Sequence, residues 1–231
     1  MKYGTGCSGI GGIDYGLDLA GWRCAFQIEN APFPRRVLRK HWPRVMLFSD
    51  VYHCGLQNLP RVNLFAFGFP CLDLSASAYG SHAGLDGSTS GPVFYQCARI
   101  ACELRPEWLL IENVPSVKKH MAKIAAALPH WNLEYADLTA SDFGAYTRRV
   151  RTFIVDILET DVPARYWIRP QSLARLFKAE GPKMFSRCAC PGKAGYPWNA
   201  LAAASLSIRK LTPLEYERAM GFPDGWTALD T

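Results

Sequence analysis

The sequence contains no apolar run long enough to cross a membrane and no recognisable targeting leader. A membrane helix needs about 20 consecutive apolar residues, and polar or charged residues interrupt every apolar stretch here well before that length. Met1 and Lys2 lead into a glycine-rich turn instead of the apolar core of a signal peptide. We therefore expect a cytoplasmic protein with no membrane partner.

Closely spaced cysteines are also scarce. The eight cysteines are scattered, most of them within apolar segments, as is typical of reduced and buried thiols. Only Cys188 and Cys190 lie near each other, whereas a structural zinc site usually draws on a second pair. The sequence therefore predicts neither a disulfide framework nor a metal site.

What the sequence does contain is enough apolar material for a packed core. Of its 231 residues, 49% are hydrophobic, which suits one α/β domain with a small appendage. The formal net charge of +6 is compatible with a nucleic-acid partner. A mildly basic, solvated surface would give the same number, so the charge alone identifies no partner.

Short apolar runs alternate with helical patterns along the first two thirds of the chain. Strands are predicted at Lys2–Cys7, Arg23–Glu29, Met46–Asp50, Leu64–Gly68, Trp108–Glu112, Leu133–Leu138 and Arg151–Leu158. Helices are predicted at Ile13–Ala20, Phe33–His41, Phe94–Leu104 and Val117–Leu128. This alternation predicts an α/β fold with a mostly parallel, twisted sheet, in which ligands bind at the carboxyl ends of the strands.

The alternation fades after Leu158, where prolines, glycines and aromatic residues become frequent. Basic residues outnumber acidic ones in this region and are interleaved with aromatic residues, a mixture that suits a nucleic-acid surface. A small irregular lobe with its own aromatic core is the alternative. We divide the chain into a main domain, residues 1–158 and 207–231, and a smaller region, residues 159–206.

Glycines follow the first predicted strand in the pattern Gly4-x-Gly6-x-x-Gly9. Such a loop lets the backbone approach a ligand closely, and the helix after it adds positive potential. Glu29 lies twenty residues beyond Gly9, at the end of the next strand, where an acid can bind ribose hydroxyls. The spacing favours an adenosine-containing cofactor, either a dinucleotide or S-adenosylmethionine, over a simple tight turn with a surface acid.

Reactive side chains lie at the ends of three further strands. Cys71 closes a Gly-Phe-Pro-Cys run after one strand, and a thiolate is a strong nucleophile. Glu112 ends another strand, where burial would let it act as a general acid. Arg149 and Arg151 lie at the start of the last strand and point to one face in extended backbone. Each has an ordinary alternative: an inert cysteine, a helix-capping acid and a solvated strand edge.

Taken together, these motifs resemble the cytosine-5 DNA methyltransferase family, and they follow the family's order along nearly the whole chain. The matching segments are Cys7-Ser8-Gly9-Ile10-Gly11-Gly12, Glu29-Asn30, Ser49-Asp50-Val51, Gly68-Phe69-Pro70-Cys71 with Ser75, Glu112-Asn113-Val114, Arg149-x-Arg151 and Arg209-Lys210-Leu211-Thr212-Pro213 with Gly221-Phe222-Pro223. Each motif is weak alone, but their common order makes the resemblance specific.

The resemblance implies a Rossmann-like methyltransferase that uses S-adenosylmethionine to methylate carbon 5 of a cytosine flipped out of double-stranded DNA. It implies Cys71 as covalent nucleophile, Glu112 as the group that protonates ring nitrogen 3, and Arg149 and Arg151 as ligands of the base carbonyl. The implied cofactor-binding residues are Cys7, Ser8, Gly9, Ile10, Gly11, Gly12, Glu29, Asn30, Asp50, Val51, Phe69 and Pro70. The implied DNA-binding residues are Ser75, Ser81 and Arg209, and no metal is implied.

The resemblance further implies a mobile lid over Ala76–Gly91 and a short target-recognition region at residues 159–206. The family pattern also includes a late Gly-Asn-x-Val segment that this sequence lacks, which points to a partner chain as its source. A DNA substrate would associate the protein with the nucleoid of a prokaryotic or phage-infected cell.

Three other functions stay open. The chain could be a non-catalytic or partner-dependent homologue that only binds DNA or cofactor. It could be an NAD-dependent oxidoreductase, since the first motif reads Gly-x-Gly-x-x-Gly, although that reading leaves Cys71 and Glu112 without a role. A tRNA methyltransferase of the same family is the third alternative.

Overall fold

The computed structural model describes residues 1–74, 83–145, 147–157 and 212–229. The predicted DNA-binding residues Ser75, Ser81 and Arg209, the recognition region 159–206 and the Cys188–Cys190 pair lie outside the described residues. Within the described part, no helix is both long and apolar enough to span a membrane.

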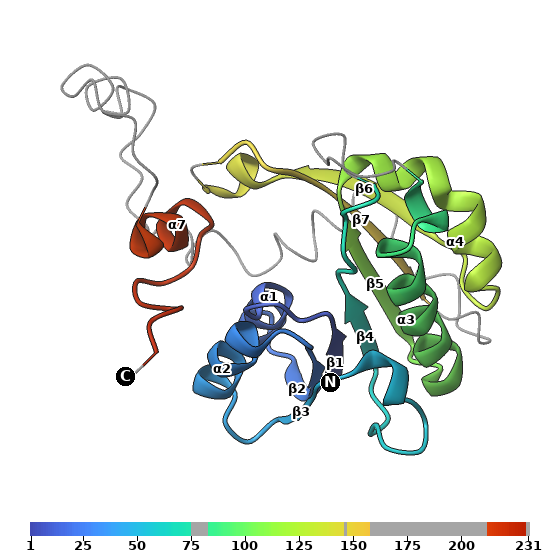
Figure 1. The fold of residues 1–231 in the computed structure, drawn as a ribbon, viewed down its shortest axis with the longest axis horizontal. Coiled ribbons are helices and arrows are strands. Elements are labelled where there is room, and N and C mark those ends of the chain that lie inside the picture. Colours follow the sequence, from blue (N-terminus) through green and yellow to red (C-terminus); the bar gives the residue numbers. More distant parts are fainter. Residues whose placement is uncertain (75–82, 146, 158–211, 230–231) are drawn as a thin grey trace.

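The centre of the molecule is a seven-stranded sheet in the order β3-β2-β1-β4-β5-β7-β6 (Figure 1). Its strands are β1 (Lys2–Gly6), β2 (Arg23–Ile28), β3 (Met46–Phe48), β4 (Leu64–Phe67), β5 (Trp108–Asn113), β6 (Glu134–Thr139) and β7 (Val150–Ile157). The first five run parallel, while β7 is antiparallel to both β5 and β6. The predicted α/β fold with a mostly parallel sheet is confirmed.

Helices cover both faces of the sheet. Helix α1 (Gly12–Leu19) packs its buried Leu17 over the face formed by Tyr3, Leu64, Ala66 and Leu110. Helices α3 (Ser90–Leu104) and α4 (Met121–Ala127) cover the opposite face, where phenylalanines of β4 and branched residues of β5 and β7 form the larger core. Helix α2 (Pro32–His41) lies beside α1 (Figure 1). The strand ends are therefore held between two helical layers.

Two predicted boundaries are wrong because side chains redirect the backbone. Strand β3 ends at Phe48 instead of Asp50, since the Asp50 carboxylate accepts the amide of Tyr52 and starts a 3-10 helix, Val51–His53. Helix α3 begins at Ser90 instead of Phe94, because the distant Asp73 carboxylate accepts the amides of Thr89 and Ser90.

The predicted helix Val117–Leu128 divides into a 3-10 helix, Pro115–His120, followed by α4. The break falls at His120, whose φ of −111° and ψ of 11° are not helical. Of the predicted lid, Ala76–Gly91, the structure describes residues 83–91: Gly84–Asp86 forms another 3-10 helix with Leu85 buried in the core, and Ser90 and Gly91 begin α3.

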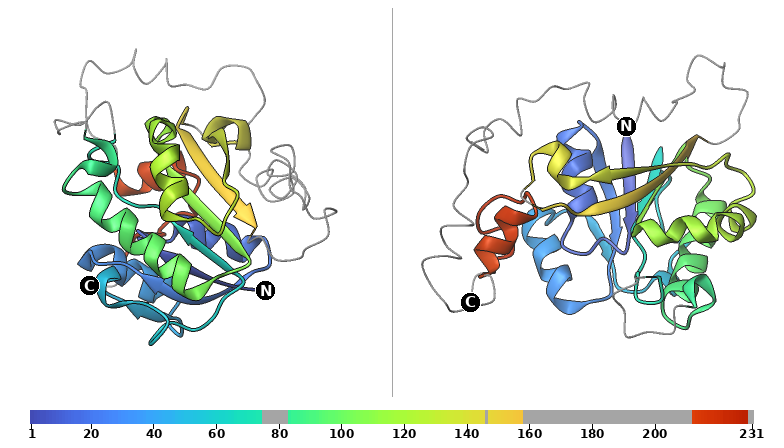
Figure 2. Two further views of the ribbon diagram at one scale, coloured as in Figure 1. Left: turned by 90° about the vertical axis from the view of Figure 1, so that its right-hand side faces the viewer. Right: turned by 90° about the horizontal axis from the view of Figure 1, so that it is seen from above.

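A segment from the end of the chain packs against the first two helices (Figure 2). Helix α7 (Pro213–Ala219) starts with a capping box in which Thr212 and Glu215 satisfy each other's backbone amides. After it, the Trp226 ring stacks on His41 with ring centroids 3.6 Å apart, and Lys40 donates to the carbonyls of Gly225 and Ala228. Residues 212–229 therefore belong with the sheet domain.

Candidate active site

Cys71 lies in a loop that leaves the sheet at the carboxyl end of β4. Phe69 anchors this loop, because its buried ring packs against Phe94 of α3 with centroids 5.1 Å apart. The side-chain amide of Asn113, at the end of β5, donates to the Phe69 carbonyl over 3.0 Å. Pro70 adds a fixed φ, and Cys71 itself is only partly buried. The loop thus holds the thiol at the surface on a rigid base.

Glu112 lies beside this loop, as the strand-end rule predicts for neighbouring parallel strands. A Cβ added to Gly68 would lie 2.9 Å from Glu112 Oε2, so the absence of a side chain at Gly68 makes room for the carboxylate. The other oxygen, Oε1, is 2.9 Å from Nε of Arg151. Three separate segments of the chain therefore meet at Glu112.

The charges at this site oppose one another. Desolvation raises the pKa of Glu112, although the Arg151 and Arg149 guanidinium groups act to lower it. Desolvation and the charge of Arg151 lower the pKa of Arg149, while Glu112 and Cys71 act to raise it. Arg149 is therefore within electrostatic range of both Glu112 and Cys71.

The two arginines do not both belong to the strand. Strand β7 begins at Val150, so Arg149 immediately precedes it, and the Arg149 carbonyl accepts the amide of Ala140. Arg151 lies within the strand and forms the ion pair with Glu112. This arrangement combines a partly exposed thiol, a carboxyl group whose pKa is raised by desolvation and two cations that can stabilise a developing negative charge.

A second group of predicted residues gathers at the carboxyl ends of β1 and β2. The loop after β1 needs a left-handed backbone at Cys7 (φ 54°), Gly9 (φ 55°) and Gly11 (φ 87°). At Gly11 a Cβ would lie 2.4 Å from the Trp42 ring, whereas at Gly9 it would meet no atom within 4 Å. The loop is therefore in close contact with Trp42 at Gly11 and has free space at Gly9.

Glu29 fixes the loop after β1. Its carboxylate accepts the amide of Gly9 over 2.8 Å and the amide of Ala31 over 2.8 Å. The residue is only 8% exposed, and each oxygen keeps one lone pair for a further donor. Its neighbour Asn30 is exposed.

The other predicted cofactor residues lie around this loop. Ser8 is buried and shares a hydrogen bond of 2.7 Å with the hydroxyl of Thr5. The carbonyl of Ile10 accepts the indole N–H of Trp226 over 2.9 Å, and Gly12 is the first residue of α1.

Two further predicted cofactor residues follow β3. Val51 is buried. The carboxylate of Asp50 accepts the amide of Tyr52 and lies against His53.

Several supporting residues were not predicted. Asn113 joins β5 to the Cys71 loop; the Glu112-Asn113-Val114 motif includes it, but the sequence predicts no role for it. Asp14 lies buried beneath the glycine loop, where it accepts hydrogen bonds from Thr5 and Gln27. Burial raises the pKa of Asp14 to about 6, although these two hydrogen bonds act to lower it. A lone acid in a helix gives no sequence signal of burial.

Comparisons with known proteins give one consistent family. The model of the C-5 cytosine-specific DNA methylases matches residues 5–179. The type II methyltransferase M2.BsuMI of Bacillus subtilis is 35% identical over 171 residues, which cover 70% of this chain and 43% of that protein. The type II methyltransferase M.MspI of Moraxella is 28% identical over 162 residues, or 67% of this chain and 38% of that protein. The chain thus spans about four-tenths of the length of these relatives.

Solved structures resemble the fold. The methyltransferase EhMeth of Entamoeba histolytica superposes with a TM-score of 0.59 at 17% identity, covering 73% of this chain and 55% of that one. The Dnmt2 methyltransferase of S. pombe gives a TM-score of 0.54 at 18% identity, covering 71% of this chain and 52% of that one.

Proposed function

The chain belongs to the C-5 cytosine-specific DNA methylase family, and on that premise we propose that it methylates carbon 5 of a cytosine flipped out of DNA, with Cys71 as the covalent nucleophile. The observation that carries the proposal is the meeting of the Cys71 loop with Glu112 and Arg151 at one end of the sheet. A strong nucleophile, a proton donor and a cation are what addition to a pyrimidine ring requires.

Cys71 and Glu112 begin the reaction together. The thiolate of Cys71, whose proton has passed to solvent water, forms a bond to carbon 6 of the base, and Glu112 gives its proton to ring nitrogen 3. The raised pKa of Glu112 favours this role, because a carboxyl group that keeps its proton at higher pH is available as an acid. The electrons pushed into the ring make carbon 5 nucleophilic.

Arg151 and Arg149 hold the base carbonyl and stabilise the charge that collects there during addition. Once carbon 5 carries the methyl group, a base such as water removes the hydrogen from that carbon. The proton on nitrogen 3 returns to Glu112, and the bond between Cys71 and carbon 6 breaks. The thiolate and the proton-holding carboxyl group are then restored for another cycle.

S-adenosylmethionine is the cofactor of this family and supplies the methyl group when bound. The residues after β1 and β2 fit it. The loop has free space at Gly9, and the Glu29 carboxylate keeps lone pairs that suit ribose hydroxyls. In this proposal Cys7–Gly12 line the cofactor, Glu29 and Asn30 bind the ribose, Asp50 and Val51 contact the adenine, and Phe69 and Pro70 separate cofactor from base.

Double-stranded DNA is the proposed substrate, because the chain belongs to the C-5 cytosine-specific DNA methylases. We assign residues 159–206 to target recognition and Ser75, Ser81 and Arg209 to DNA contact, with residues 1–158 and 207–231 as the catalytic domain. Such an enzyme works where the cell's DNA is, at the nucleoid.

Covalent trapping on DNA that contains 5-fluorocytosine tests the proposal. Fluorine on carbon 5 cannot leave as a proton does, so the enzyme stays bonded to the base. With S-adenosylmethionine present, we expect wild type and the control Cys102→Ser to form a complex that survives denaturing electrophoresis, and Cys71→Ser to form none. Cys102 suits as the control because its partly buried thiol donates to the Ala127 carbonyl, eight positions along α3 from Phe94, which packs on the Cys71 loop.

Two results would overturn the proposal. Methylation of ordinary DNA by Cys71→Ser would remove Cys71 as the nucleophile. Failure of wild type both to form the complex and to transfer labelled methyl groups to mixed-sequence DNA would identify a non-catalytic or partner-dependent homologue instead. Adding tRNA as a competitor of DNA in the same assay shows which of the two nucleic acids the protein methylates.

A further inference from the structure

The chain leaves the sheet at β3 and enters a stretch, residues 50–58, that we call the β3 loop. Strand β3 is three residues long and pairs only with β2, so the sheet itself does little to fix the residues after it. Apart from one short 3-10 helix, the β3 loop has no regular structure. Contacts from elsewhere must therefore hold it in place.

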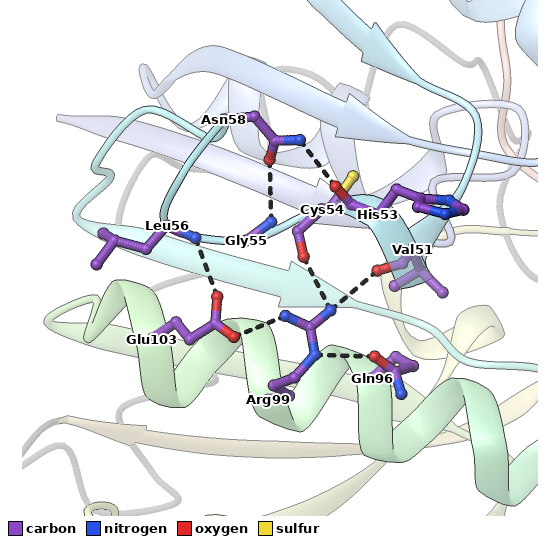
Figure 3. Close-up of polar contacts among 9 residues, drawn as sticks. All are labelled: Val51, His53, Cys54, Gly55, Leu56, Asn58, Gln96, Arg99 and Glu103. Atoms are coloured by element: carbon purple, nitrogen blue, oxygen red, sulfur yellow. Dashed lines mark hydrogen bonds and ion pairs between the residues drawn. The ribbon is translucent and has the colours of Figure 1, made fainter.

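Arg99 of α3 provides these contacts (Figure 3). Its Nη2 donates to the carbonyl of Cys54 over 2.8 Å and to the carbonyl of Val51 over 3.3 Å. The rest of the guanidinium is held on its own helix, by Gln96 through Nε and by Glu103 through Nη1. Because the planar group is fixed on three sides, it presents its donors to the β3 loop in one orientation.

Glu103 extends the attachment by one turn of the helix. Its Oε1 pairs with Arg99, and its Oε2 accepts the amide of Leu56 over 3.0 Å (Figure 3). Gly55 permits this approach, since a Cβ there would lie 2.3 Å from Glu103 Oε2. Asn58 closes the loop by accepting the amide of Gly55 and donating to the carbonyl of His53.

The orientation of Asp50 depends on the same loop. Its carboxylate is bound by the amide of Tyr52 and the ring of His53, and its carbonyl accepts the Cys54 thiol over 3.1 Å. The Cys54 carbonyl is the one that Arg99 holds most closely. A change at Arg99 would therefore reach Asp50 through the backbone, without any direct contact.

We propose that Arg99, supported by Glu103, is a positioning residue that fixes the β3 loop so that Asp50 and Val51 can receive the adenosine part of the cofactor. This inference rests on the proposed function, because it assigns the β3 loop to cofactor binding. Within the described residues, the side-chain hydrogen bonds of Arg99 reach only its own helix and the β3 loop. Its effect should therefore fall on cofactor affinity more than on the chemical step.

The test compares Arg99→Gln and Arg99→Lys with the matched variant Arg61→Gln. Arg61 also donates to a backbone carbonyl of α3, that of Leu104, but it lies outside the β3 loop, three positions after Asn58. Equilibrium dialysis with labelled S-adenosylmethionine should give a Kd about tenfold higher for Arg99→Gln, the effect expected on losing one charge-assisted hydrogen bond. Arg99→Lys should recover part of the loss, and Arg61→Gln should match wild type.

Hydrogen exchange on the cofactor-free protein gives a second readout. The amides of residues 50–58 should exchange faster in Arg99→Gln, with the rest of the sheet unchanged. In methylation assays the KM for S-adenosylmethionine should rise, while kcat at saturating cofactor should stay within about twofold of wild type.

The outcomes distinguish failure of the positioning role of Arg99 from failure of the proposed methyltransferase function. If wild type binds S-adenosylmethionine and Arg99→Gln binds it equally well, the positioning role is wrong and the proposed function stands. A fall in kcat at constant KM would also contradict the inference. If wild type binds no S-adenosylmethionine, the function fails and the inference fails with it.

Discussion

Two glutamates at the ends of parallel strands show how the same residue serves different purposes. Glu29, after β2, gives its carboxylate oxygens to the backbone amides of Gly9 and Ala31. Glu112, at the end of β5, instead pairs with the Arg151 side chain through one oxygen and lies close to Gly68 with the other. The first carboxylate fixes a loop, while the second pairs with a side chain and is the proton donor in the proposed reaction.

The difference extends to the regions around them. The proposed cofactor side depends on backbone amides that donate to a carboxylate, centred on Gly9 and Glu29. The proposed catalytic side brings together three distant parts of the chain, namely the Cys71 loop, Glu112 and Arg151. Changes on the cofactor side should therefore reduce affinity, whereas changes on the catalytic side should reduce rate.

The largest effect is expected for Glu112→Gln. The amide keeps the shape but cannot donate the proton, so single-turnover methylation should fall by about 100-fold or more while DNA affinity changes little. In wild type, a rate that needs protonated Glu112 should decline as pH rises through its raised pKa, and this alkaline decline should be absent in the variant. The exposed Glu134→Gln on β6 serves as control. Equal methylation rates in wild type and Glu112→Gln would show that Glu112 is not the proton donor and so does not differ from Glu29 in this respect.

A smaller effect is expected for Glu29→Gln. One carboxylate oxygen becomes an NH₂ group that faces a backbone amide, so one of the two loop contacts is lost. The Kd for S-adenosylmethionine should rise about tenfold, which corresponds to one hydrogen bond to a charged group. Calorimetry measures it, with Glu107→Gln, a surface acid that accepts a hydrogen bond from Asn63, as control. A lower methylation rate for Glu29→Gln at saturating cofactor would contradict the expectation that Glu29 acts on affinity and not on rate.

The smallest effect is expected for Trp226→Phe. This change removes the indole N–H that donates to the Ile10 carbonyl but keeps an aromatic ring against His41. Losing one neutral hydrogen bond is worth about 1 kcal/mol, so cofactor affinity should fall about fivefold at most. Trp131→Phe is a matched control, because the buried Trp131 N–H has no hydrogen-bond partner among the described residues. If Trp226→Phe and Trp131→Phe bind the cofactor equally well, the Trp226–Ile10 hydrogen bond does not contribute to cofactor binding.

The sequence predicts the centres of the described strands and the residues at their carboxyl ends, because local apolar runs determine both. It does not predict the Glu112–Arg151 pair, since nothing local indicates that β7 inserts antiparallel between β5 and β6. The early start of α3 is missed for a similar reason. Its cap comes from Asp73, which lies seventeen positions before Ser90.

The contact between Trp226 and Ile10 also has a consequence for the order of events during synthesis. The two residues are 216 positions apart. At about 5 to 20 residues per second, the glycine loop leaves the ribosome roughly 10 to 40 s before its distant partner is made. Contacts of such long range also form slowly, because a large loop must close first. Until Trp226 has been made, the glycine loop can therefore be fixed by Glu29 but not by the indole of Trp226.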